Sequence, residues 1–176
     1  MGYNSLPMDA EVRGLIEQLQ LRPHPEGGYY RESYRSTEQA TALPKRFDGP
    51  RSLSTAILFL LPHGHISTLH RIKSDELWHF YQGAPLRVVS ITPEGTRHDV
   101  VLGSCFDGGH RCQAIVPEGR WFGAHVESNN GWALVGCNVA PGFEFTDFEM
   151  VERGELIGRY PQHTSIITSL TTGGMH

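Results

Sequence analysis

The sequence contains no long hydrophobic run and no concentration of positive charge. Its longest apolar run, Ala56 to Leu61, is far shorter than the ~20 residues that a membrane helix needs. The chain has 15 Lys and Arg against 19 Asp and Glu, giving a net charge of −4. The basic residues form no stripe, so neither a nucleic acid nor an anionic membrane is an expected partner.

Cysteine is also scarce, because the 176 residues include only Cys105, Cys112 and Cys137. An odd number without C-x-x-C spacing argues against a disulfide framework or a zinc ribbon. Residues 1–10 lack the basic start and apolar stretch of a signal peptide. These absences predict a cytoplasmic protein whose whole chain, residues 1–176, is a single domain.

One segment has the pattern of an amphipathic helix. Asp9 can cap it, and apolar residues recur at i, i+3, i+4 and i+7, namely Val12, Leu15, Ile16 and Leu19. The helix must end before Pro23, and we expect it to pack on a sheet.

The rest of the chain reads mainly as short strands separated by turns. The expected strands are 29–36, 54–61, 76–82, 86–91, 96–102, 111–116, 120–126, 132–139 and 143–148. Asn130-Gly131 predicts a hairpin between its flanking strands, and residues 37–50 predict a polar loop. With 20 Gly and 11 Pro, this pattern predicts an all-β sandwich or barrel. Its core spans about residues 20–150, residues 152–160 can form a short C-terminal helix, and the tail from about His163 is expected to fray.

The histidines are clustered around a recognisable motif. His63, His65, His70 and His79 fall within 17 residues, and Glu76 is followed by six residues and Gly83. The latter is the second half of the first cupin motif, G-x5-H-x-H-x(3,4)-E-x6-G, and Pro117 to Gly119 matches the P-x-G of the second. The sequence therefore resembles the cupin superfamily.

Four longer segments resemble one branch of single-domain cupins of unknown function. They are PHPEGGYYRE (23–32), HRIKSDELWHFYQG (70–83), VPEGRWFGA (116–124) and APGFEFTDFE (140–149). The resemblance implies a cupin-type double-stranded β-helix, which is a jelly-roll barrel, and a homodimer.

The metal-binding part of the cupin pattern is incomplete. Thr68 stands where the first histidine of H-x-H belongs, and Phe122 where the last metal-binding histidine belongs. Only His70 and Glu76 match, whereas a metal site needs three protein ligands. His125 or His79 could supply the third, although strand alternation places His79 on the face opposite Glu76. We therefore predict no metal, and a divalent ion at His70 and Glu76 is the disfavoured alternative.

Without a metal, the same residues predict a small-molecule pocket. Alternation puts Glu76 on an inward face with two aromatic residues, and we expect His70 on the adjacent strand. Burial should raise the pKa of Glu76, and a nearby carboxylate should raise that of His70. His70 and Glu76 are the predicted catalytic pair. The predicted substrate-binding residues are Thr68, Trp78, Phe80, Tyr29, Arg31 and Phe122, with Arg31 pairing with an anionic group.

This pocket predicts a metal-independent isomerase or epimerase acting on a polar or sugar-like compound, with His70 as the base. A non-catalytic metabolite-binding cupin and a metal-dependent oxygenase or isomerase are the alternatives.

Three further residues are given structural readings. Glu26, with Gly27 and Gly28, could line the mouth of the pocket, but turn chemistry explains this Pro-Glu-Gly-Gly turn without a function. Cys137 is read as an inert buried thiol. Lys73 is explained by a charged loop.

Overall fold

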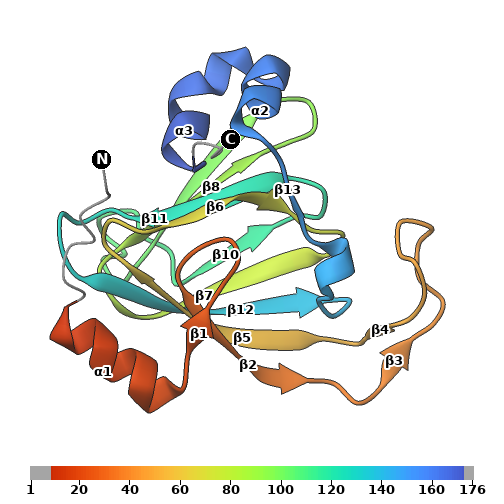
Figure 1. Cartoon of the computed structure of the whole chain (residues 1–176), viewed down its shortest axis with the longest axis horizontal. Helices are drawn as coiled ribbons and strands as arrows, with labels where there is room; N and C mark the ends of the chain where they lie inside the picture. The colour runs from red at the N-terminus through yellow and green to blue at the C-terminus, as the bar shows by residue number, and fades with distance from the viewer. Residues whose placement is uncertain (1–8, 173–176) are drawn as a thin grey trace.

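The computed structural model describes residues 9–172, which form two antiparallel sheets packed face to face (Figure 1). The six-stranded sheet contains, in spatial order, β1 (Arg22–Pro23), β2 (Tyr29–Arg35), β5 (Thr55–Pro62), β12 (Trp132–Ala140), β7 (Asp75–Gly83) and β10 (Gln113–Val116). The five-stranded sheet contains β13 (Glu149–Met150), β6 (Ile66–Arg71), β11 (Trp121–Val126), β8 (Leu86–Ile91) and β9 (Arg97–Leu102). The predicted all-β sandwich is confirmed.

The predicted N-terminal helix, α1 (Ala10–Leu19), is also confirmed. The Asp9 side chain accepts a hydrogen bond from the Glu11 backbone N–H at 3.0 Å, which satisfies a free donor of the first turn. Gln20 ends the helix in the left-handed conformation. Val12 packs with Leu60 and Trp132, so the helix covers part of the outer face of the six-stranded sheet.

The main core lies between the two sheets and is centred on aromatic rings. The indole of Trp78 meets the rings of Phe59 and Phe122 edge-on, at 6.0 and 6.4 Å between centroids. Such edge-to-face contacts are favourable in addition to the burial of the rings. Aliphatic residues of both sheets fill the remaining space.

The C-terminal residues cover the outer face of the five-stranded sheet (Figure 1). The expected short helix is present as α2 (Arg153–Arg159), and η2 (Pro161–His163) and α3 (Thr164–Ser169) follow it. Ile167 and Leu170 are fully buried. The structure therefore differs from the predicted frayed tail up to residue 172, because these apolar side chains pack against the sheet. The last residues of that tail, 173–176, lie outside the described residues.

Three local predictions are wrong. Asn130-Gly131 forms a turn with Gly131 at φ 84°, but β11 pairs with β6 and β8 whereas β12 pairs with β5 and β7. The turn therefore carries the chain from one sheet to the other, and no hairpin forms. Residues 143–148 contain the 3-10 turn η1 (Phe145–Asp147) in place of a strand. Finally, β6 and β7 belong to different sheets, so His70 and Glu76 do not lie on adjacent strands.

The polar segment after β2 forms a separate projection (Figure 1). Within it, β3 (Gln39–Ala40) and β4 (Arg51–Ser52) pair as a short two-stranded ribbon. Among the described residues, none of the helices has the length and apolar character required to cross a membrane.

Candidate functional site

A cavity of about 80 Å³ opens between the two sheets. Glu76 and Cys137 line it from the six-stranded sheet, His70 and Ile72 from β6 and the residue after it, and Phe148 from the segment after β12. A buried water needs ~10–15 Å³ by this measure, so the cavity has room for roughly five to eight waters or a small organic molecule.

The turn between β1 and β2 inserts Glu26 into this cavity. Gly27 and Gly28 have φ angles of 112° and 67°, which favour glycine. A Cβ atom on Gly27 would lie 2.1 Å from the carbonyl oxygen of Ile66, so only glycine allows the turn to approach β6 this closely. The Thr68 backbone N–H donates to the Glu26 carbonyl at 2.8 Å and fixes the turn. Glu26 is buried as a result.

His70 and Glu26 form a buried pair. His70 Nδ1 lies 2.7 Å from the Thr68 carbonyl oxygen, which can only accept, so Nδ1 carries a proton. His70 Nε2 lies 3.3 Å from Glu26 Oε2, and the Ser67 hydroxyl donates to Glu26 Oε1 at 2.8 Å. In a neutral imidazole Nε2 then has no proton and can accept one, and Glu26 Oε2 faces it.

Burial shifts the pKa of both members of this pair toward the uncharged form. It lowers the pKa of His70 to about 4, against a smaller raising effect of the hydrogen bond to Thr68. It also raises the pKa of Glu26, against the lowering effects of His24 and Ser67. The pKa of His70 thus moves opposite to the sequence-based prediction, because desolvation of the imidazolium is the largest effect on this buried ring.

Glu76 is a second buried carboxyl group in the same cavity. Burial, followed by the nearby Glu26 carboxyl, raises the pKa of Glu76 to about 8. A hydrogen bond from the Cys137 thiol opposes this shift slightly. Cys137 is buried as predicted, but it also lines the cavity and contacts Glu76. At neutral pH the cavity therefore holds a mostly protonated Glu76 and a neutral His70, beside the Glu26 carboxyl group whose pKa is also raised.

His24 adds a second imidazole that the sequence analysis missed. It lines the cavity, its ring meets Tyr30 edge-on at 4.4 Å and it stacks with Phe145 at 6.1 Å. Its Nδ1 lies 3.4 Å from Glu26 Oε2. Burial lowers the pKa of His24, although the Glu26 carboxyl opposes this. The motif PHPEGG was the sequence feature that could have indicated His24 and Glu26 as site residues. Its two glycines, however, also suit an ordinary turn.

Charged residues surround the entrance to the cavity. Arg35 donates to Glu144 Oε1 at 2.6 Å, to both carboxylate oxygens of Glu32 at 3.0 and 2.8 Å, and to the Phe143 carbonyl at 3.1 Å. Arg22 lies across the ring of Tyr30, with its guanidinium carbon 4.9 Å from the centroid. We call Arg22, Glu32, Arg35 and Glu144 the entrance residues.

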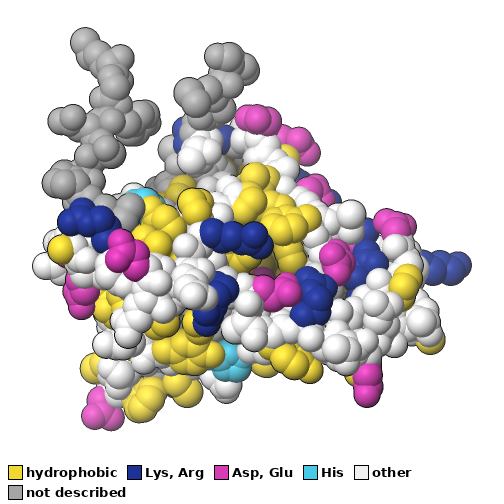
Figure 2. All heavy atoms as spheres, turned by 60° about the horizontal axis from the view of Figure 1, so that its bottom comes forward, with side chains coloured by type: hydrophobic (Ala, Val, Ile, Leu, Met, Phe, Trp, Pro, Cys, Tyr) yellow, Lys and Arg dark blue, Asp and Glu magenta, His cyan; other side chains and the backbone are white. Residues whose placement is uncertain are grey.

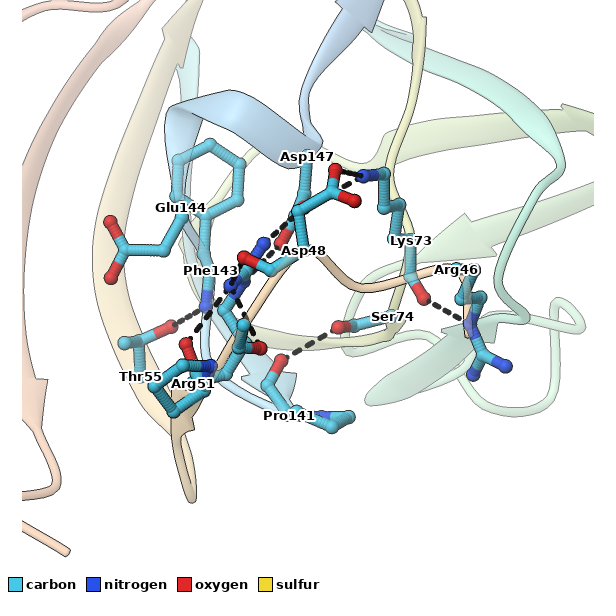
Figure 3. A network of polar contacts seen from close by, with 12 residues as sticks. Arg46, Asp48, Arg51, Thr55, Lys73, Ser74, Pro141, Phe143, Glu144 and Asp147 are labelled. Atoms are coloured by element: carbon cyan, nitrogen blue, oxygen red, sulfur yellow. Dashed lines mark hydrogen bonds and ion pairs between the residues drawn. The ribbon is translucent and has the colours of Figure 1, made fainter. Parts of the chain in front are cut away.

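The segment 141–148 covers one side of the cavity and is held by a buried ion pair (Figure 3). Arg51 donates from Nε and Nη2 to the two carboxylate oxygens of Asp147, at 2.6 and 2.8 Å, and both side chains are buried. Lys73 Nζ lies 3.3 Å from Asp147 Oδ1. At the start of the segment, the Ser74 hydroxyl donates to the Pro141 carbonyl at 2.7 Å. Lys73 thus helps to hold the cavity wall, whereas the sequence analysis assigned it only to a charged loop.

The structure brings His70 and Glu76, from opposite sheets, to the lining of one cavity. It places the predicted substrate-binding residues elsewhere. Trp78 and Phe122 are in the core, where the Phe122 ring lies 4.1 Å from that of His70. Phe80 packs at the edge of this core, and Thr68 contacts His70 and Glu26 through its backbone.

Tyr29 and Arg31 lie on the other face of β2 from the cavity. Tyr30 and Glu32 line the cavity, and alternation along the strand directs their neighbours outward. Tyr29 packs in the cluster beneath α1, 6.2 Å from His65. Arg31 Nη1 donates to Gln20, just after α1, at 3.4 Å.

The donor set does not fit a metal ion. Among residues 9–172, no group of three or more His, Cys, Asp and Glu side chains is arranged to hold one. His79 Nδ1 instead contacts Gln113 at 2.9 Å, and His125 Nε2 contacts Glu127 at 3.3 Å. Phe122 packs on His70 at the position of the missing histidine ligand.

Comparison with known proteins shows the family of this chain. A family model described as "Cupin superfamily (DUF985)" matches residues 13–151. The chain belongs to this cupin family. An uncharacterized protein of Saccharomyces cerevisiae, YML079W, is 29% identical over 151 residues, which cover 78% of this chain and 74% of the yeast protein.

Two solved structures share the fold over nearly their full length. Protein SO0799 of Shewanella oneidensis is 39% identical, with a TM-score of 0.82 over 92% of this chain and 97% of that one. A hypothetical protein of Leishmania major is 34% identical, with a TM-score of 0.84 over 90% and 97%. Oxalate decarboxylase, 17% identical with a TM-score of 0.51, shares the cupin fold over 87% of this chain and 37% of its own.

Proposed function

We propose that this cupin is an isomerase- or epimerase-like enzyme that moves a proton on a small polar or sugar-like substrate without a metal. The observation that carries the proposal is the pair of opposed walls, with His70 and Glu26 on one and Glu76 on the other. Burial shifts the pKa of all three toward the uncharged form, to about 8 for Glu76 and about 4 for His70. Carboxyl groups with a pKa near the working pH are suited to general acid–base catalysis.

The contacts of His70 indicate which group accepts the proton. Both nitrogens of His70 are engaged, with Thr68 and with Glu26. We therefore assign the accepting role to Glu76, whose pKa of about 8 leaves part of it ionised at neutral pH. Glu76 takes the proton from a carbon next to a carbonyl group, and the electron pair of the C–H bond moves into an enolate. The His70–Glu26 pair donates a proton to that enolate, and solvent exchange restores both groups.

Exchange of solvent deuterium into substrate tests this proposal. Small hydroxy acids, aldoses and ketoses are incubated with the protein in D₂O, and their C–H signals are followed by NMR. We expect wild-type protein to catalyse exchange in at least one of them, and Glu76→Gln and His70→Gln to lower the rate by about 100-fold or more. A chelator should leave the rate unchanged.

His79→Gln is the matched control, because His79 lies on the same strand as Glu76 but contacts Gln113 outside the cavity. It should retain the wild-type rate. Equal rates in wild type, Glu76→Gln and His70→Gln would contradict the proposal.

A non-catalytic metabolite-binding protein is the second candidate, and the engagement of both His70 nitrogens favours it. In that case a thermal-shift screen identifies a ligand that the protein binds without exchange. A ligand at ~100 times its dissociation constant stabilises a protein by about 2.7 kcal/mol, which is readily detected.

We also propose a homodimer formed through the outer face of the six-stranded sheet. Tyr81 on β7 and Ile115 on the neighbouring β10 are 53% and 64% exposed, and α1 covers a different part of this face. Hydrophobic side chains lie among charged ones on this side of the molecule (Figure 2). We expect light scattering to give twice the chain mass, and Ile115→Lys to lower it to one chain. A wild-type monomer at every concentration would contradict this proposal.

A further inference from the structure

Two arginines of the described chain line the cavity, and they differ in how their donors are used. Arg35 donates to Glu32, to Glu144 and to a backbone carbonyl, so little of its guanidinium is free for a ligand. For Arg22, no hydrogen bond or ion pair joins the guanidinium to another side chain within residues 9–172. Its contact with the Tyr30 ring uses the flat face of the guanidinium and leaves the N–H groups at the edge available.

The position of Arg22 links it to the interior of the cavity. Arg22 is exposed on β1, whereas Tyr30, on which it lies, is buried and lines the same cavity. The charge of Arg22 also contributes to the lowered pKa of His24, which places the guanidinium near the cavity. A ligand that reaches His24 and Glu26 can therefore contact Arg22 at the same time.

The rest of the lining restricts where a charged group of the ligand can bind. At neutral pH Glu76 is mostly protonated and His70 is neutral, so the space between them suits hydroxyl and carbonyl groups. On the Arg35 side of the entrance, one arginine faces two carboxylates, which leaves one negative charge in excess. An anionic group is therefore favoured at Arg22 and disfavoured beside Glu32 and Glu144.

We infer that the ligand of this cavity is a small hydroxylated or carbonyl compound with one terminal anionic group, a carboxylate or a phosphate, which pairs with Arg22 at the entrance. This inference rests on the proposed function, because it assigns the substrate class of the same cavity. The uncharged end of the ligand enters between His70 and Glu76, and the anionic end remains at the solvent-exposed rim. Arg31, the anion-binding residue that the sequence predicted, contacts Gln20 on the other face of β2.

A matched series of three-carbon probes tests this inference. Glycerol is neutral, glycerate carries a carboxylate and glycerol 3-phosphate carries a phosphate on the same frame. Calorimetric titration of the wild type should show at least one anionic probe binding about tenfold or more tightly than glycerol, since a charge-assisted pair contributes this much. The preferred anion distinguishes a carboxylate ligand from a phosphate ligand. Binding should weaken as salt increases, because the rim is open to solvent.

Three variants test whether Arg22 causes the preference for an anionic probe. Arg22→Gln should abolish the preference for the anion, while an unchanged unfolding temperature shows that it folds. Arg111→Gln removes the same charge from an exposed residue outside the cavity lining and should keep the preference. Persistence of the preference in Arg22→Gln, its loss in Arg31→Gln alone, or no binding of either anion at millimolar concentration would each overturn the inference.

Failure of this inference is distinguishable from failure of the proposed function, because equilibrium binding requires no turnover. Deuterium exchange into a neutral sugar with the anionic probes unbound would support the proposed reaction and overturn the role of Arg22. Anion binding that depends on Arg22, without exchange in any compound, would support the role of Arg22 and contradict the reaction.

Discussion

Two carboxyl groups of this protein are almost equally buried, yet they are held in opposite protonation states. Asp147 is 6% exposed and Glu76 is 7% exposed. Burial raises the pKa of both, but at Asp147 the hydrogen bonds and charge of Arg51, helped by Lys73, bring the pKa below its ordinary value. Beside Glu76 lie another carboxyl group and a thiol, and the pKa rises to about 8. The neighbours, and not the depth of burial, decide whether a carboxyl group holds the fold or remains available for proton transfer.

Removing Arg51, the main cationic partner of Asp147, should give the largest effect on stability. In Arg51→Met, Asp147 remains buried with only Lys73 as a cationic partner. Removal of one partner of a buried ion pair costs about 3–5 kcal/mol, and we expect a loss of this size in the free energy of unfolding measured by urea denaturation.

The double variant Arg51→Met/Asp147→Leu is the control for this prediction. It removes both charges together, so it should recover much of the lost stability. A loss below about 1 kcal/mol in the single variant would show that Asp147 is compensated by other means, and the comparison with Glu76 would then fail.

Glu76→Gln should have a smaller effect on the free energy of unfolding, and it should stabilise the protein. The pKa of Glu76 is about 8 in the folded protein, against an ordinary value of 4.5. The folded state therefore binds more protons between these values, and the wild type loses stability as the pH rises from about 4.5 through about 8. Gln cannot ionise, so the variant should be more stable than the wild type by at least about 1 kcal/mol at pH 7.

This gain should disappear near pH 4, where Glu76 is protonated in both states. Urea denaturation of the two proteins across this range measures the difference, in which the contributions of His24 and His70 are common to both proteins. His70 changes the stability over a different pH range. Because its pKa is about 4 in the folded protein, against an ordinary 6.5, its contribution to stability is complete above pH 6.5 and is lost as the pH falls toward 4. A difference between wild type and variant that does not change with pH would contradict the raised pKa of Glu76.

The sequence predicted local elements well because their signals are local. The 3.6-residue periodicity and Asp9 located α1, and the β-branched run gave β8 with the same limits, Leu86–Ile91. Strand partners depend on contacts far apart in sequence, which periodicity does not encode. The turn at Asn130-Gly131 shows this, since its chemistry suits a hairpin but its two strands join different sheets.

The sequence predicted only part of the candidate site, because only some of its residues carry a local signal. His70 and Glu76 were identified because they match positions of a known motif, and strand alternation correctly separated Glu76 from His79. The pairing of Glu26 with His70 spans a turn and two elements, and it depends on how closely the glycines bring that turn to β6. The Arg51–Asp147 pair joins residues 96 positions apart, for which the sequence carries no local signal.

The placement of Asp147 on the same short segment as Glu144 and Phe145 has a consequence for how this family can diversify. Asp147 is locked to Arg51, whereas Phe145 is 51% exposed and Glu144 reaches only to Arg35 at the rim. Neighbouring positions therefore differ sharply in their tolerance to substitution. We expect substitutions at 144 and 145 to change the rim of the cavity while the Arg51–Asp147 pair keeps the segment in place.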